Sequence, residues 1–304
     1  MSSHRSATAF LIGASASWGV GTVVSKQVLS TFPPLPLLGV QLFVSSAALL
    51  VVAILTGHRI DRNRDTAKAA ALGVLNPGLA YALGLIGLTY ISASTAVLLW
   101  AIEPVLIACL AALILHERLP RSVYVFMAIA VLGVLLVVYE PGVGGNVFGV
   151  IITIVAILCC AVYTVLARAL AIDQGALSVT LVQQMSAFAF AVALAVVVAG
   201  VTGTLPDLSA VGPTDWAGAA ISGLLYYALA FWLYLSGLRG VSAGVAGAFL
   251  TLIPVFGVAA AFVVGERLEP WQWAGGVVVI TSMAFLMRTL ARTEEARHGD
   301  HLAV

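Results

Sequence analysis

Charged side chains are scarce in this sequence. Asp, Glu, Lys and Arg make up 9% of the 304 residues, whereas 62% are hydrophobic and the mean hydropathy is +1.10. Because a soluble domain carries roughly 25% charged residues, the chain cannot cover a water-facing surface of the size it would need. The sequence therefore predicts an integral membrane protein. The formal net charge of +1 gives no electrostatic reason to expect a nucleic-acid partner.

Cysteine and histidine are also rare, and their positions exclude several kinds of chemistry. Cys109, Cys159 and Cys160 lie in apolar runs, where we interpret them as packing residues rather than a disulfide or metal site. All five histidines lie in the termini or at predicted helix ends, so no buried serine has an imidazole beside it. The sequence has no Walker motif, and HERLP (116–120) lacks the second histidine of a zinc HExxH motif. We therefore expect neither an enzyme nor a metal or other cofactor.

Apolar runs between charges give the number of membrane crossings. A helix needs about 20 apolar residues to cross a hydrocarbon core of about 30 Å. The runs cover residues 6–25, 27–57, 69–115, 122–139, 141–167, 174–206, 216–238, 240–265 and 271–287. The run 69–115 contains one charge, Glu103, and is long enough for two crossings joined by a tight turn near residues 90–92. Because backbone groups in lipid must be paired within their own segment, we predict an all-α fold of ten transmembrane helices.

Lysine and arginine are unevenly distributed between the two ends of these helices. Twelve of the fourteen lie in the N-terminus, the even-numbered loops and the C-terminus, and only Lys26 and Arg267 lie at the other end. Because positive residues stay on the cytoplasmic side, both termini are expected in the cytoplasm. Arg5 and the apolar stretch after it resemble a signal peptide. We interpret this segment as the first helix instead, because the second half of the chain contains a partner for it.

The second half of the sequence repeats the first. Residues 87–137 align with 237–287 at an offset of 150, which becomes 149 after the shared proline. The matched pairs are Pro104 with Pro254, Glu117-Arg118-Leu119 with Glu266-Arg267-Leu268, SWGVGTVVSKQVL (17–29) with CCAVYTVLARALA (159–171), and Tyr-Ala-Leu at 81–83 with 227–229. We predict a first repeat over 1–140, a second over 141–290 and a cytoplasmic tail over 291–304.

Each predicted repeat holds five helices, which is an odd number. The second repeat must therefore enter the membrane upside down relative to the first. Two similar halves of opposite orientation can open a site near the bilayer midplane to one side and then to the other. The repeat therefore predicts a secondary transporter. A channel remains an alternative, although the sequence contains no filter-like loop or ring of charge.

The motif that occurs once in each half resembles the motif of a known family. A small-residue helix that runs into Pro-Val, then about a dozen apolar residues and Glu-Arg-Leu, is similar to the ten-helix EamA branch of the drug/metabolite transporter superfamily. The resemblance spans about residues 7–290, and within the branch the chain most resembles YddG-type amino-acid exporters. It implies export of amino acids, aromatic and other neutral ones, or related metabolites across a bacterial inner membrane. The alternative is export of other drugs or metabolites, such as cationic toxic compounds. The resemblance also implies a central cavity lined by helices 1, 3, 4, 6, 8 and 9.

Glu103 is the strongest candidate site residue. A carboxylate inside the membrane is costly and defaults to a functional hypothesis. It can carry a proton or bind a substrate ammonium, and the structural alternative is a glutamate bonded to a neighbouring helix near the unpaired carbonyls left by Pro104. The second repeat has Ile253 in its place, which favours a chemical role over an architectural one.

Deep aromatic residues are the other candidates. They are Trp18, Tyr81, Trp100, Tyr163, Tyr227 and Trp232, all far from the predicted helix ends. A cavity walled by aromatic rings with a few polar tips suits amphiphilic ligands, and simple packing is the alternative for each residue. The near absence of cations inside the spans argues against phosphorylated cargo and favours small zwitterionic or weakly charged substrates. We expect a monomer or a weak homodimer.

Five further residues have more limited predicted roles. Pro104 and Pro254 are expected to kink their helices and act as hinges. Lys26 is expected either to extend its ammonium to the membrane surface or to contact a substrate carboxylate. Glu117 and Glu266 precede prolines at helix entries, so we predict structural roles at these turns.

Overall fold

The structure is a computed structural model that describes residues 2–58, 63–114, 121–139, 146–170, 175–238 and 249–302, which contain helices and no strand. The helices are α1 (Ser2–Val28), α2 (Pro34–Leu55), α3 (Arg64–Gly73), η1 (Val74–Leu79), α4 (Ala80–Tyr90), α5 (Ala93–Trp100), α6 (Glu103–Ile114), α7 (Arg121–Val138), α8 (Val147–Ala169), α9 (Ala176–Thr202), α10 (Pro213–Gly223), η2 (Leu224–Leu229), α11 (Ala230–Leu238), α13 (Ile253–Val263) and α14 (Pro270–Leu302). Segments η1 and η2 are short π-helical stretches within longer helices.

Local sequence signals set several helix starts. Pro34 occupies the first turn of α2, where its missing N–H costs nothing. The Asn63 side chain accepts a hydrogen bond from the Thr66 N–H at 2.9 Å and caps α3. The Ser92 hydroxyl accepts from the Thr95 N–H at 3.0 Å and caps α5. This last cap forms the tight turn that the sequence predicts near residues 90–92.

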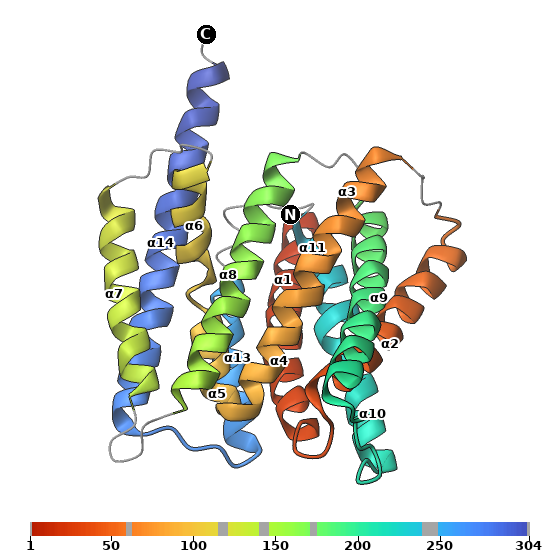
Figure 1. The fold of residues 1–304 in the computed structure, drawn as a ribbon. Helices are drawn as coiled ribbons and strands as arrows, with labels where there is room; N and C mark the ends of the chain where they lie inside the picture. The colour runs from red at the N-terminus through yellow and green to blue at the C-terminus, as the bar shows by residue number, and fades with distance from the viewer. Residues whose placement is uncertain are drawn as a thin grey trace.

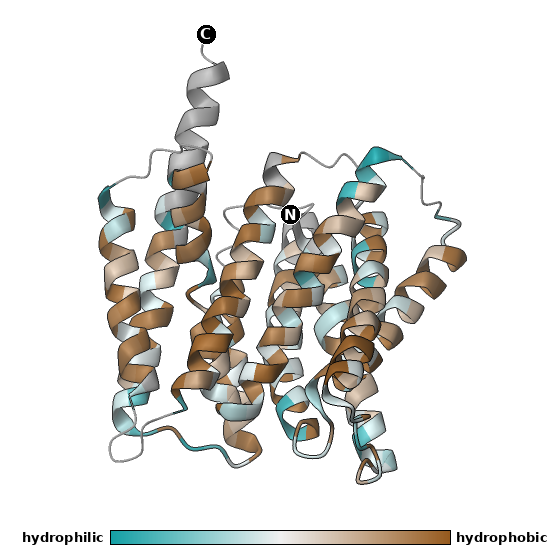
Figure 2. Ribbon diagram, viewed as in Figure 1, coloured by the Kyte–Doolittle hydropathy of each residue, from teal (hydrophilic) through white to brown (hydrophobic). Residues whose placement is uncertain are grey.

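These elements make ten membrane crossings, as the sequence predicts. Three crossings are composite and consist of α3, η1 and α4, of α5 and α6, and of α10, η2 and α11. Seven crossings are long and apolar enough to span a bilayer by length and composition, and the remaining three are α7, α13 and α14. Figure 2 shows hydrophobic residues along the helices and hydrophilic residues concentrated toward the two ends of the bundle. The chain is therefore a multi-pass membrane protein.

The two halves of the bundle have opposite orientations. Both chain termini lie at one end (Figure 1), which we call the terminal face, and the other end is the opposite face. Helix α6 ends and α7 begins at the terminal face. The corresponding connection in the second half, residues 264–269 between α13 and α14, lies at the opposite face. This inversion confirms the inverted repeat.

The helix contacts follow the same two-fold pattern. Helix α1 packs on α11 and α13 of the second half, and its repeat partner α8 packs on α4 and α6 of the first half. Helices α2 and α9, which are repeat partners, pack on each other, and so do α7 and α14. The main contacts therefore join one half to the other, and the central space is enclosed by both.

The structure corrects one detail of the sequence alignment. The π-helical segments η1 and η2 begin at Val74 and Leu224, so the offset of 150 continues through this crossing. Tyr81 is therefore matched by Phe231 and not by Tyr227. The three-letter match Tyr-Ala-Leu is misleading because it lies one helical turn away from the true structural register.

Candidate functional site

The helix that carries Glu103 is broken immediately before it. Helix α5 ends at Trp100, residues 101–102 form a turn, and α6 begins at Glu103. The second half has the same break, because residues 251–252 form a turn and α13 begins at Ile253. Each break lies two residues before the shared proline. These breaks are the structural counterpart of the predicted hinges at Pro104 and Pro254.

This break explains how the fold accommodates a carboxylate within a membrane crossing. Glu103 lies in the first turn of α6, where the exposed N–H groups and the helix dipole favour negative charge. Cys160 of α8 lies beside the Glu103 side chain. Pro104 is the sequence signal for this break, because proline cannot donate to the carbonyl one turn earlier, although the apolar pattern does not mark residues 101–102. Glu103 therefore lies at a helix start, with Cys160 beside it, within the interior of the bundle.

Three of the predicted aromatic residues converge on one point between the halves. The Tyr81 ring lies 5.8 Å from the Trp100 ring and 5.3 Å from the Tyr227 ring, with both pairs in edge-to-face geometry. The ring of Tyr226 completes the cluster, 5.4 Å from Tyr81 and 5.2 Å from Tyr227. The cluster joins α4 and α5 of the first half to η2 of the second. Rings at these distances attract one another through their quadrupoles.

A small cavity adjoins this aromatic cluster. It is lined by Thr22, Ser25, Tyr81, Gly84, Leu85, Leu88, Ala96, Trp100, Tyr226 and Tyr227. Its volume is about 30 Å³. This is enough space for water but not for an amino acid. Glu103 does not line the cavity, but it lies one helical turn after Trp100, which does. The cavity therefore combines aromatic walls with the hydroxyl groups of Thr22 and Ser25, and Glu103 lies one helical turn from its lining.

The other three predicted residues do not line this cavity. Trp18 packs against Phe231 and Tyr234 at 5.3 and 5.7 Å. Tyr163 donates a hydrogen bond to Gln183 Oε1 at 3.1 Å, between α8 and α9. Trp232 is 52% exposed on the outside of the bundle. The structure therefore does not bring these three residues together with Tyr81, Trp100 and Tyr227.

Buried amides form a polar network that sequence reasoning did not identify. Gln41 Nε2 of α2 donates to Ser25 Oγ at 2.9 Å and to Ser222 Oγ at 2.8 Å. Gln184 of α9 donates to the Tyr227 carbonyl of η2 at 3.0 Å and accepts from the Ser45 hydroxyl. Amides within apolar runs were the available signal, because a buried polar group is costly unless it is hydrogen-bonded. The Gln41 bonds join α1, α2 and α10, and the Gln184 bonds join α2, α9 and η2. Ser25 belongs to the Gln41 group and also lines the cavity.

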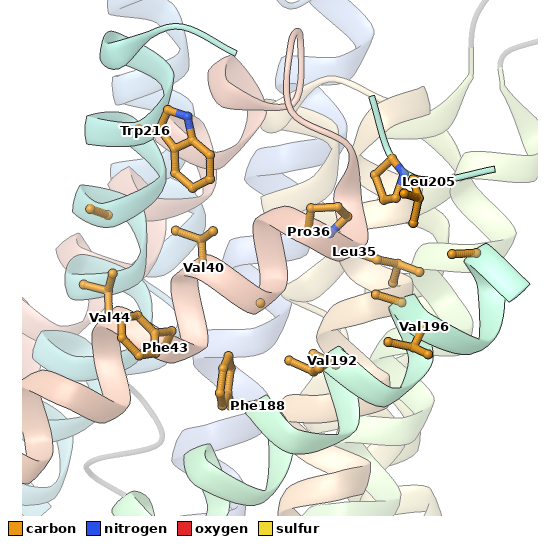
Figure 3. Close-up of a pocket in the computed structure, with 16 residues that line it drawn as sticks. Leu35, Pro36, Val40, Phe43, Val44, Phe188, Val192, Val196, Leu205 and Trp216 are labelled. Atoms are coloured by element: carbon orange, nitrogen blue, oxygen red, sulfur yellow. The ribbon is translucent and has the colours of Figure 1, made fainter. Parts of the chain in front are cut away.

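A larger cavity of about 630 Å³ lies elsewhere, between α2 and α9 (Figure 3). Its lining is apolar, and Phe43 and Phe188 face each other within it at 5.7 Å. Phe43 is 58% exposed and Val196 is 66% exposed, so this groove opens on the lipid-facing surface. It carries no polar side chain for orienting a substrate, and we therefore place the candidate site at the smaller cavity.

An all-helical membrane bundle of two inverted halves with a cavity between them is the architecture of a secondary transporter. The EamA-like transporter family matches the chain twice, over residues 5–139 and 147–288. The two matches cover most of the sequence, and the chain belongs to this family. It is a family of transporters and not of enzymes.

Individual relatives agree with this assignment. The uncharacterized transporter YyaM of Bacillus subtilis (strain 168) is 26% identical over 288 residues, which are 91% of this chain and 92% of YyaM. The uncharacterized transporter YetK of the same organism is 25% identical over 86% of this chain and 80% of its own. A crystal structure 20% identical in sequence superposes with a TM-score of 0.67 and covers 95% of this chain and 99% of its own. At that identity the likeness concerns the fold alone.

Proposed function

We propose that this transporter exports neutral amino acids, aromatic ones among them, across the inner membrane of a bacterium by alternating access. The aromatic cavity between the two halves, with Glu103 one helical turn from the lining residue Trp100, carries this proposal. Aromatic rings can hold an apolar side chain, and a carboxylate at the start of a half-helix can bind or deprotonate an ammonium group. Together they match the apolar side chain and the ammonium group of a neutral amino acid.

The volume of the cavity supports alternating access. A space of about 30 Å³ holds one water molecule and no amino acid, so binding requires the helices around it to separate. The breaks at residues 101–102 and 251–252 are at equivalent places in the two halves. Bending at these breaks, beside Pro104 and Pro254, would open the cavity toward one face at a time.

Export of cationic aromatic compounds is the second candidate. The same observation favours it, because a cation is attracted both to aromatic faces and to a carboxylate. Counterflow into proteoliposomes that contain only this protein separates the two candidates. We expect labelled phenylalanine and leucine to exchange against unlabelled amino acids. Exchange of a permanently cationic aromatic dye without exchange of amino acids would replace the first proposal with the second.

Removal of single aromatic rings tests the location of the site. Because aromatic pairs each contribute ~0.5–1.5 kcal/mol, we expect Tyr81→Ala and Trp100→Ala each to reduce phenylalanine transport about tenfold. Trp232→Ala is the matched control, since it removes an equally large side chain from the lipid-facing surface and should leave transport unchanged. Purified yield and melting temperature establish that the variants fold. Normal transport by both folded cavity variants would show that these rings only pack.

The orientation of the chain is tested by a reporter at Gly144. The charge distribution predicts cytoplasmic termini, and α7 ends and α8 begins at the face opposite the termini (Figure 1). Gly144 itself lies outside the described residues. An alkaline phosphatase fused there should be active because it is exported, and a fusion after the C-terminus should be inactive. A cytoplasmic reporter at Gly144 would reverse the proposed direction of export.

A further inference from the structure

Glu266 of the second half binds the first turn of a helix in the first half. Its Oε1 accepts a hydrogen bond from the Ala93 N–H at 2.8 Å. Its Oε2 accepts from the Ser94 N–H at 2.9 Å and from the Ser94 hydroxyl at 2.8 Å. The carboxylate therefore satisfies two N–H groups that the helix itself leaves unpaired, and it carries the charge that the N-terminal dipole favours. Glu266 therefore has a structural role, as predicted, but the group it binds is the start of α5, which is distant in the sequence.

Lys26 holds the other side of the same turn. Its ammonium donates to the carbonyl oxygens of Leu88 at 2.8 Å and Thr89 at 3.4 Å, in the last turn of α4. A cation at a helix C-terminus complements the dipole there. The tight turn between α4 and α5 is thus held by a cation from α1 and by a carboxylate from the loop after α13. Both contacts lie at the opposite face.

The helices beneath this turn are in close contact. Val23 of α1, Ala93 of α5 and Ala261 of α13 are buried together in one cluster. Deeper in the bundle, a Cβ on Gly19 would lie 2.6 Å from the backbone nitrogen of Gly257. A Cβ on Gly257 would lie 2.7 Å from the Val97 side chain. Helices α1, α5 and α13 therefore close the space between the small cavity and the opposite face.

We propose that Glu266 is a positioning residue for transport, which latches the opposite face shut by binding the first turn of α5. Helices α5 and α13 belong to different halves, so any motion that separates the halves at this face must break the Glu266 hydrogen bonds. The carboxylate acts through α5 and does not contact the substrate. This role rests on the proposed alternating access.

Glu266→Gln keeps the shape of the side chain and weakens the latch. An amide oxygen can still accept one hydrogen bond, but the amide NH₂ presents a donor to the N–H groups of α5. Hydrogen bonds to charged groups are about twice as strong as neutral ones. We therefore expect the open fraction at this face to rise about tenfold, which corresponds to ~1.4 kcal/mol. Glu266→Asp keeps the charge at a shorter reach and should restore part of the closure.

Accessibility of a single cysteine measures this opening directly. The reporter is Ala96→Cys, which lines the small cavity, in a chain whose native cysteines are replaced by alanine. A membrane-impermeant maleimide is applied to right-side-out and to inside-out vesicles. A second cysteine variant at Thr204, exposed in the loop after α9 at the opposite face, identifies the preparation that exposes that face. Labelling of the cysteine at position 96 should be about tenfold faster in Glu266→Gln, and only in the vesicles that expose the opposite face.

Glu269→Gln is the matched control, because it removes the same charge from an exposed position three residues along the same loop. Its labelling rate should equal that of the parent. An unchanged rate in Glu266→Gln would overturn the proposal, as would a rise of equal size from both sides, which indicates general loosening of the fold. The assay contains no substrate. If labelling behaves as expected while amino acids are not transported, the proposed substrate fails and the latch stands.

Discussion

Glu103→Gln is expected to abolish accumulation of amino acids driven by a pH gradient and to weaken substrate affinity. An isolated charge inside a bundle costs several kcal/mol, so this carboxylate must release or pair its charge during the cycle. Glutamine retains the shape and one hydrogen-bond acceptor, but it can neither carry a proton nor neutralise an ammonium group. The helix start at residue 103 should persist, because it depends on the break at residues 101–102.

Two measurements on proteoliposomes separate the possible roles of Glu103. Accumulation with an imposed pH gradient reports proton coupling, and counterflow without a gradient reports substrate binding. If only accumulation under the pH gradient is lost, Glu103 is a proton carrier. If substrate affinity falls under both conditions, Glu103 binds the substrate ammonium. Glu269→Gln serves as the charge-matched control at the surface. A wild-type result for Glu103→Gln under both conditions would leave it with the architectural role of a helix-start residue.

Gly19→Ala should destabilise the protein strongly for so small a change. The added Cβ would lie 2.6 Å from the Gly257 nitrogen and 2.7 Å from the Ile253 carbonyl oxygen. Both atoms belong to the backbone of α13, so no side chain can move aside and the two helices must separate. Overpacking of this kind costs typically 1–3 kcal/mol. The expected result is a lower melting temperature in detergent and a lower yield of folded protein.

Gly39→Ala provides the comparison, since a Cβ there meets nothing within 4 Å. This variant should melt at the wild-type temperature or slightly higher, because alanine is the better helix former. Equal melting temperatures for the two variants would show that α1 and α13 are not in the close contact described above. Contact between α1 and α13 could then not be what closes the opposite face.

Sequence alone was sufficient for the number of crossings and for their pairing in two inverted halves. The thickness of the bilayer fixes the length of each apolar run, and the position of each charge marks where a run ends. Both are local properties of the chain. The repeated Pro-Val and Glu-Arg-Leu phrases reveal the two halves because equivalent turns need similar residues. Of the six deep aromatic residues proposed as a cavity wall, Tyr81, Trp100 and Tyr227 lie together in the structure, and the other three do not join them.

Tertiary structure alone decided which deep residues face the cavity and which face lipid. Lipid and protein interior are both apolar, so hydropathy cannot distinguish the exposed Trp232 from the enclosed Trp100. Pro104 predicts a kink in this helix, but the apolar pattern does not show that a new helix begins at Glu103. The partner of Glu266 lies more than 170 residues away in sequence, where no local pattern could connect a carboxylate with the unpaired N–H groups that it binds. Such partners are fixed only when the two halves pack against each other.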